Sequence, residues 1–159
     1  MNIRRVSFDH PDAVKLNDQV QAEYAARYED DGDATYLDPA MFDPPSGLYL
    51  IAYDGQERPV ATGGWRGHDE ETEEGYLPGD AELKRMYVVA EARGLGLARR
   101  ILAALEDDAR TAGRTRMVLE TGDRQPEAIA LYTSSGYAPC EKFGYYRHFE
   151  SSRCFAKSL

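Results

Sequence analysis

The spacing of apolar and polar residues along the chain predicts its secondary structure. Short apolar or alternating runs predict strands at 2–8, 48–53, 60–65, 80–89, 117–121, 137–142 and 154–159. Apolar positions at helical intervals predict helices over 12–28, from Leu97 to a stop at Gly113, and over 127–135. We expect Asp12 to cap the first helix and a short helical turn to begin at Pro39. Residues 66–79 are acidic and aperiodic, so we expect a mobile excursion there.

The most informative segment is the turn at residues 93–98, which joins an apolar strand to a long amphipathic helix. Gly94 and Gly96 have no side chains, so the backbone N–H groups of this turn can approach a ligand closely. The N-terminus of the following helix adds a partial positive charge. The turn is therefore expected to bind an anion.

Two common phosphate-binding motifs do not fit this turn. A dinucleotide fingerprint needs Gly or Ala at the third position after its second glycine, where this chain has Arg99. A nucleoside-triphosphate loop ends in Gly-Lys-Ser/Thr, which the segment lacks. The pattern that remains is Arg-x-x-Gly-x-Ala, from Arg93 to Ala98.

A second segment and an upstream acid accompany the turn. Residues 126–137 form a short helical pattern that ends in Leu131-Tyr132 and is followed by Gly136-Tyr137. Glu82 stands on the strand before the turn. In this order the three features resemble the GNAT superfamily, the acyl-CoA-dependent N-acyltransferases. The resemblance extends over roughly the whole chain and is strongest from Ala81 to Tyr137.

The resemblance implies an α/β (α+β mixed) fold, with a twisted mixed β-sheet and helices on both faces, and acetyl-CoA as the acyl donor. It implies that Tyr132 protonates the leaving thiolate and that Glu82 is the general base. It also implies that the turn holds the coenzyme A pyrophosphate and that an adjacent strand pairs with the pantetheine arm. The implied coenzyme-binding residues are Met86, Tyr87, Val88, Arg93, Gly94, Leu95, Gly96, Leu97, Ala98 and Gln125. Many family members have Asn where this chain has Gln125.

Acyl transfer from a thioester requires a neutral amine, a polarised carbonyl and a proton for the thiolate. Glu82 is the best-placed carboxylate for the first task, although a surface acid paired with Lys84 or Arg85 would give the same pattern. Tyr132 suits the last task, although it could simply pack against Tyr137. Candidate residues for an acceptor pocket are Trp65, Arg66, Tyr24, Tyr28, Phe42, Tyr145 and Tyr146.

Composition narrows the function further. At 159 residues the chain is expected to form a single domain, residues 1–159, and no segment approaches the roughly 20 apolar residues of a membrane span. The charged N-terminus lacks the apolar core of a signal peptide, so we expect a cytoplasmic protein. In that compartment Cys140 and Cys154 are expected to remain reduced.

The formal net charge of −9 argues against nucleic acid as a partner. No metal is expected, because His10, His68 and His148 lack ligand spacing. The partner we expect is a small-molecule or peptide amine acceptor. We expect no binding to a membrane, and the sequence leaves open whether the protein forms a homodimer. The sequence thus predicts an acetyl-CoA-dependent N-acetyltransferase that works by direct transfer in a ternary complex. The alternatives are a non-catalytic acyl-CoA-binding sensor and an acyltransferase for protein N-termini.

Overall fold

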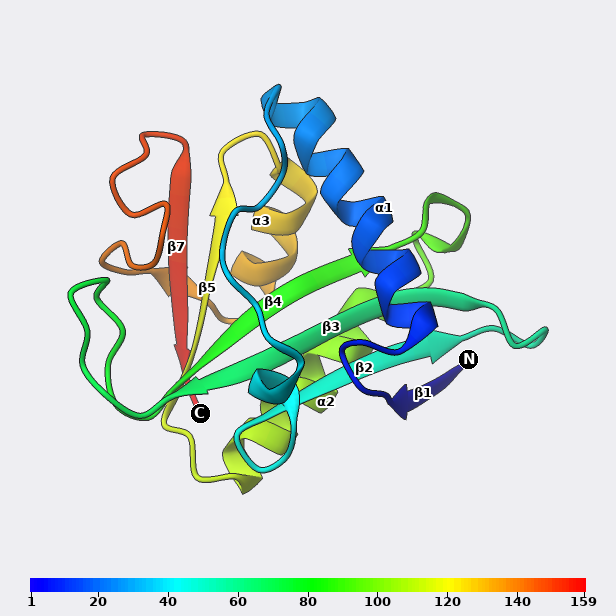
Figure 1. Ribbon diagram of the computed structural model, residues 1–159, viewed down its shortest axis with the longest axis horizontal. Coiled ribbons are helices and arrows are strands. Elements are labelled where there is room, and N and C mark those ends of the chain that lie inside the picture. Colours follow the sequence, from blue (N-terminus) through cyan, green and yellow to red (C-terminus); the bar gives the residue numbers. More distant parts are fainter.

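A computed structural model describes all of residues 1–159. Its strands form one seven-stranded mixed sheet in the order β1-β2-β3-β4-β5-β7-β6 (Figure 1). The strands are β1 (Asn2–Arg5), β2 (Gly47–Tyr53), β3 (Pro59–His68), β4 (Asp80–Val88), β5 (Arg116–Gly122), β6 (Ala138–Pro139) and β7 (Ser152–Ser158). The helices are α1 (Pro11–Tyr28), α2 (Leu97–Thr111) and α3 (Pro126–Ser134), with 3-10 turns η1 (Pro39–Phe42) and η2 (Ala90–Ala92). All neighbouring strands are antiparallel except β4 and β5.

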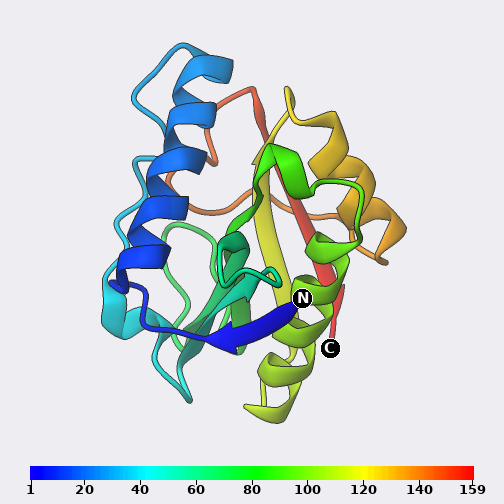
Figure 2. The same cartoon turned by 90° about the vertical axis from the view of Figure 1, so that its right-hand side faces the viewer.

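The helices cover both faces of the sheet, as expected. Figures 1 and 2 show α1 against one face and α2 with α3 against the other. The apolar face of α2 is fully buried: Ile101 and Leu105 are 0 % exposed in the larger core cluster. On the opposite face, Leu16 of α1 packs with Tyr49 and Ile51 of β2. None of the three helices combines the length and apolar content that crossing a membrane requires.

A β-bulge interrupts the pairing of β3 with β4. The register shifts between Thr62 and Gly64. Arg85 has a φ of 59°, in the left-handed region that residues other than glycine rarely adopt. A Cβ on Gly63 would collide with the Met86 sulfur, so a larger residue opposite the bulge would require the Met86 side chain to move. Consecutive residues of a regular strand face opposite sides, and the bulge breaks this alternation in β4.

β4 and β5 lie side by side only at one end. Their parallel pairing covers Asp80 to Glu82 on β4 and Arg116 to Val118 on β5. Beyond these residues the two strands diverge, as Figure 1 shows. The divergence leaves an opening between the C-terminal ends of two central strands.

The structure corrects three details of the expected secondary structure. His10 rather than Asp12 caps α1: its Nδ1 accepts the Asp12 backbone N–H at 3.0 Å. The Asp12 carboxylate instead accepts the Tyr53 hydroxyl at 2.7 Å. The strand expected at 137–142 is reduced to two residues, because Pro139 has no N–H to donate to the ladder.

The third correction concerns residues 66–79. β3 extends through His68, so the first three of these residues belong to the sheet. Further along, Tyr76 is only 4 % exposed and stacks on the His68 ring with centroids 3.7 Å apart. Aromatic burial therefore anchors a segment whose lack of periodicity suggested an unattached loop.

Candidate active site

Two cavities meet at the opening between β4 and β5. The turn cavity has a volume of about 450 Å³ and is lined by the 93–98 turn, the end of β4, α1 and α3. The loop cavity, of about 390 Å³, lies between the diverging strands and is covered by the loop after α1 and the loop before β7. The residues that line both cavities are Tyr24, Met86, Gln125, Ala128 and Tyr132. A molecule in one cavity would therefore reach a molecule in the other at this junction.

The wall of the turn cavity has the features of an anion site. Gly94 and Gly96 have φ values of 82° and 77°, and both face open space, with no atom near the position of a Cβ. Gly96 is also the N-cap of α2 and provides no side chain to bind the first N–H groups of the helix. The wall of this cavity suits a phosphate group, because it contains the uncapped N-terminus of α2, where unsatisfied N–H groups and the positive end of the helix dipole favour an anion.

Two residues of the turn lie differently from the others. The Arg93 side chain is half exposed, and its Nε donates to the Val88 carbonyl while its guanidinium pairs with Glu23 of α1, both at 3.0 Å. Arg93 thus ties the turn to β4 and α1. Leu95 is 60 % exposed and does not line the cavity, whereas Leu97 and Ala98 do.

The end of β4 presents backbone groups to the turn cavity, and among these the Val88 carbonyl already accepts Arg93 Nε. Met86, Tyr87 and Val88 line this cavity. The Val89 N–H donates to the Val60 carbonyl on β3, so the backbone groups of Val88 point the other way, into the opening. An extended ligand could pair with this edge as an added strand, and the Val88 N–H could polarise a carbonyl oxygen.

Two tyrosines, Tyr132 and Tyr24, line both cavities at the junction. Tyr132 on α3 is 6 % exposed, and Tyr24 on α1 lines both cavities beside it. Burial raises the pKa of Tyr132 and Tyr24 well above the ordinary tyrosine value, and no hydrogen bond contributes to either shift. Both phenols are therefore protonated at neutral pH, and their protons are available to a bound molecule.

Glu82 occupies a different place from Tyr132. It is 2 % exposed and lines neither cavity. Its Oε1 lies 2.9 Å from Arg66 Nε and 3.0 Å from His68 Nε2, and its Oε2 accepts the Tyr76 hydroxyl at 3.3 Å. Burial alone would raise the pKa of Glu82, but Lys84, His68 and Arg66 outweigh it and lower this pKa to about 2. Glu82 is therefore ionised and enclosed by its partners.

The loop cavity contains a carboxylate that sequence reasoning missed. Glu120 on β5 lines this cavity. Burial raises its pKa, an effect that Lys84 and Ser152 partly offset. A carboxyl group with a raised pKa is a better proton acceptor than an ordinary one. The available signal was an acid inside the apolar run of residues 117–121.

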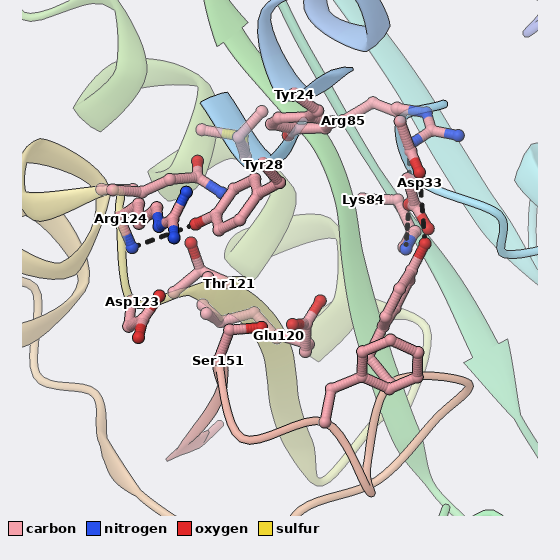
Figure 3. Close-up of a pocket in the computed structure, with 18 of the residues that line it drawn as sticks. Tyr24, Tyr28, Asp33, Lys84, Arg85, Glu120, Thr121, Asp123, Arg124 and Ser151 are labelled. Atoms are coloured by element: carbon pink, nitrogen blue, oxygen red, sulfur yellow. Dashed lines mark hydrogen bonds and ion pairs between the residues drawn. The ribbon is translucent and has the colours of Figure 1, made fainter. Parts of the chain in front are cut away.

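Opposite Glu120, one carboxylate holds two cations. Asp33 Oδ2 lies 3.0 Å from Lys84 Nζ and 2.7 Å from an Arg85 Nη atom, as the dashed lines of Figure 3 show. Burial would raise the pKa of Asp33, but the two cations outweigh it and lower this pKa far below the usual range. This group ties the loop after α1 to the bulge of β4.

A tyrosine joins the two loops that cover the cavity. The Tyr146 hydroxyl accepts the Ala34 N–H at 2.7 Å and donates to the Gly32 carbonyl at 3.3 Å. Of the aromatic residues proposed for an acceptor pocket, Tyr24, Tyr28 and Tyr146 line this cavity, whereas Trp65 and Phe42 are buried in the core clusters.

The comparisons with known proteins agree with this geometry. A family model described as the acetyltransferase (GNAT) family matches residues 14–137. The chain belongs to the GNAT family. The matched range contains the 93–98 turn, Glu120 and Tyr132.

Relatives and solved structures extend the similarity of this GNAT protein. It is 46 % identical over 76 residues to IAA acetyltransferase of Azospirillum brasilense, covering 48 % of this chain and 47 % of that relative, so the match spans about half of that relative's length. It is 30 % identical to the N-acetyltransferase YjgM of Escherichia coli (strain K12), covering 85 % of this chain and 80 % of YjgM. A Klebsiella pneumoniae structure described as an acyl-CoA N-acyltransferase superposes with a TM-score of 0.78 at 29 % identity, covering 99 % and 97 % of the two chains.

We expect Glu82→Gln to lower the free energy of unfolding by about 3 kcal/mol at pH 7, because the buried Arg66 and His68 lose their ionised partner. The pKa of Glu82 is lower in the folded protein than its unfolded value of about 4.3, so its contribution is complete above that value and is lost as the pH falls towards 2. Urea unfolding from pH 7 to pH 3 should show the variant's deficit narrowing below about pH 5.

The control is Asp107→Asn, which removes an exposed ion pair with Arg110 and should change stability by less than about 1 kcal/mol. A deficit for Glu82→Gln as small as that of the control would contradict the structural role of this cluster.

Proposed function

We propose that this protein is an N-acetyltransferase that transfers the acetyl group of acetyl-CoA directly to a primary amine within a ternary complex. The observation that carries the proposal is the meeting of two cavities at Tyr132, one beside an anion-binding turn and one beside a carboxylate of raised pKa. Family membership supports acetyl transfer. Neither Cys nor Ser occurs among the five residues shared by the two cavities, which favours direct transfer over a covalent intermediate.

On the donor side, the N–H groups from Gly94 to Ala98 would bind the coenzyme pyrophosphate. Met86 and Val88 would pair with the pantetheine arm through their backbone, and the Val88 N–H would hydrogen-bond the thioester oxygen. Gln125, at the N-cap of α3, lines both cavities and could bind the same arm through its amide.

On the acceptor side, the amine must lose a proton before its nitrogen can attack the acetyl carbon. Glu120 lines the cavity that would hold the amine, so we propose it as the general base in preference to Glu82, which its buried partners enclose. As the carbon–sulfur bond breaks, Tyr132 would give its phenolic proton to the thiolate. The products are an N-acetylated amine and free coenzyme A.

Gly96→Asp tests the donor site. The new carboxylate would meet the pyrophosphate and repel it, so we expect calorimetry to show at least about a 100-fold weaker affinity for acetyl-CoA. The matched control is Gly113→Asp, because Gly113 also has a positive φ, of 87°, and open space around it, but lies beyond the other end of α2. Equal affinities for the two folded variants would place the pyrophosphate elsewhere.

Tyr132→Phe tests the proton donor. The ring and its packing are kept while the proton is lost, so we expect kcat to fall by about 10- to 10⁴-fold with little change in coenzyme affinity. Coenzyme A release under saturating substrates measures the first quantity, and calorimetry the second. Wild-type turnover by a variant that binds coenzyme normally would show that another group protonates the thiolate.

The base can be identified by comparing Glu120→Gln with Glu82→Gln. If Glu120 is the base, its variant should lose most activity near neutral pH and recover as the pH approaches the pKa of the acceptor amine itself, where solvent supplies the neutral amine. The pH–rate profile of Glu82→Gln should parallel that of the wild-type protein, provided that the assay is run under conditions in which the variant remains folded. The reverse assignment of the two profiles would make Glu82 the base, as the sequence alone suggested.

A further inference from the structure

The loop cavity has an unusual pair of adjacent cations. Lys84 and Arg85 are consecutive in β4, yet both reach the same oxygen of Asp33. In a regular strand their side chains would face opposite sides of the sheet, and the bulge brings them to the same side. Their side chains are only 10 % and 6 % exposed. One carboxylate thus balances two buried positive charges, which leaves a surplus of one.

Arg85 itself is incompletely bonded and conformationally strained. Its side chain makes a single hydrogen bond, from Nη1 to Asp33, and its buried Nε has no partner. A guanidinium has five N–H groups and is usually found where several of them are used. The residue also holds a φ of 59°, which Gly or Asn would adopt at lower cost. The missing hydrogen-bond partner and the strained backbone together indicate that the Arg85 side chain serves to bind a ligand.

The opposite charge lies across the opening. Glu120 forms no ion pair and lines the same cavity from β5, on the strand facing Lys84 (Figure 3). Among the lining residues that are not exposed, Lys84 and Arg85 are cations and Asp33 and Glu120 are carboxylates, while Asp30, Asp123 and Arg124 lie exposed at the rim. The four inner charges sum to zero, but the two cations share the single carboxylate of Asp33, and Glu120 forms an ion pair with neither of them.

We propose that the acceptor is an α-amino acid or a similar zwitterionic amine, whose carboxylate pairs with Arg85 and Lys84 while its amine lies towards Glu120. This inference rests on the proposed function and names its substrate class. A simple monoamine would leave the surplus charge of Arg85 unmatched, and a polyamine would place a second cation beside it. A zwitterion matches both unpaired charges. The rings of Tyr28 and Tyr146 also line the cavity and offer an apolar wall for the amino acid's side chain.

Matched acceptors test the proposal directly. We expect kcat/KM, measured by coenzyme A release, to be about 10- to 100-fold higher for phenylalanine than for phenethylamine, and likewise for leucine over isoamylamine, mainly through KM. Each pair differs only by the carboxylate. In Arg85→Asn the ratio of kcat/KM within each pair should fall to about 1, because Asn tolerates the positive φ but carries no charge. In Arg110→Gln, which removes an exposed guanidinium on α2, the preference should be that of wild type.

Two results would overturn the proposal. One is equal or better use of the decarboxylated amines, or of spermidine, by the wild-type protein. The other is an unchanged preference in Arg85→Asn accompanied by a lower melting temperature, which would show that the two cations only tie the loop after α1 to β4. Calorimetric titration of the same pairs into coenzyme A-saturated protein measures the preference without turnover. Absence of turnover with every acceptor would contradict the proposed reaction, while this binding ratio would still decide the acceptor class.

Discussion

Beyond Glu82 and Val118, β4 and β5 no longer hydrogen-bond to each other, and the rest of the site depends on this separation. Unpaired backbone groups in the middle of a sheet are costly unless something else bonds to them. Arg93 Nε satisfies the Val88 carbonyl at the far end of the opening. The remaining groups are left for a ligand, so the same break in the ladder creates both the space and its hydrogen-bonding edge.

The closed end of the two strands needs stabilisation if the other end is to stay open. Asp80 pairs with Arg116 directly across the β4–β5 ladder, with Nε to Oδ1 at 2.8 Å. Glu82 lies at the last paired position with Arg66 and His68 around it, so a buried ion cluster marks the point where pairing stops. The bulge at Arg85 follows three residues later and turns the free part of β4. The geometry of the opening is thus held from its closed end.

The parts of the candidate site for which the sequence alone made a prediction are local ones. The turn from Arg93 to Ala98 and the helix carrying Tyr132 are contiguous segments, so their geometry follows from residue types a few positions apart. The mixed sheet with helices on both faces was also predictable, since strong apolar periodicity and the family resemblance agreed on it. Gly94 and Gly96, which the sequence indicated for their lack of side chains, also adopt positive φ values.

The parts that the sequence could not predict depend on contacts between distant segments. Asp33 lies in an acidic stretch of the sequence, and its partners are more than 50 positions away on a bulge that no periodicity reveals. Glu120 became a candidate base only when the divergence of β4 and β5 exposed it to a cavity. Glu82 stood on the strand expected before the turn, but its enclosure depends on Tyr76, which lay in a segment without pattern.

The hydroxyl of Tyr146 hydrogen-bonds to the backbone of Gly32 and Ala34. This one side chain therefore links the two loops that cover the loop cavity, although they lie over 110 positions apart in sequence. Neither loop can change its length or path without disturbing the other's anchorage. Evolution of specificity for a new acceptor would therefore proceed by matched changes in both loops. A graft that moves one loop from a relative should bring its counterpart as well.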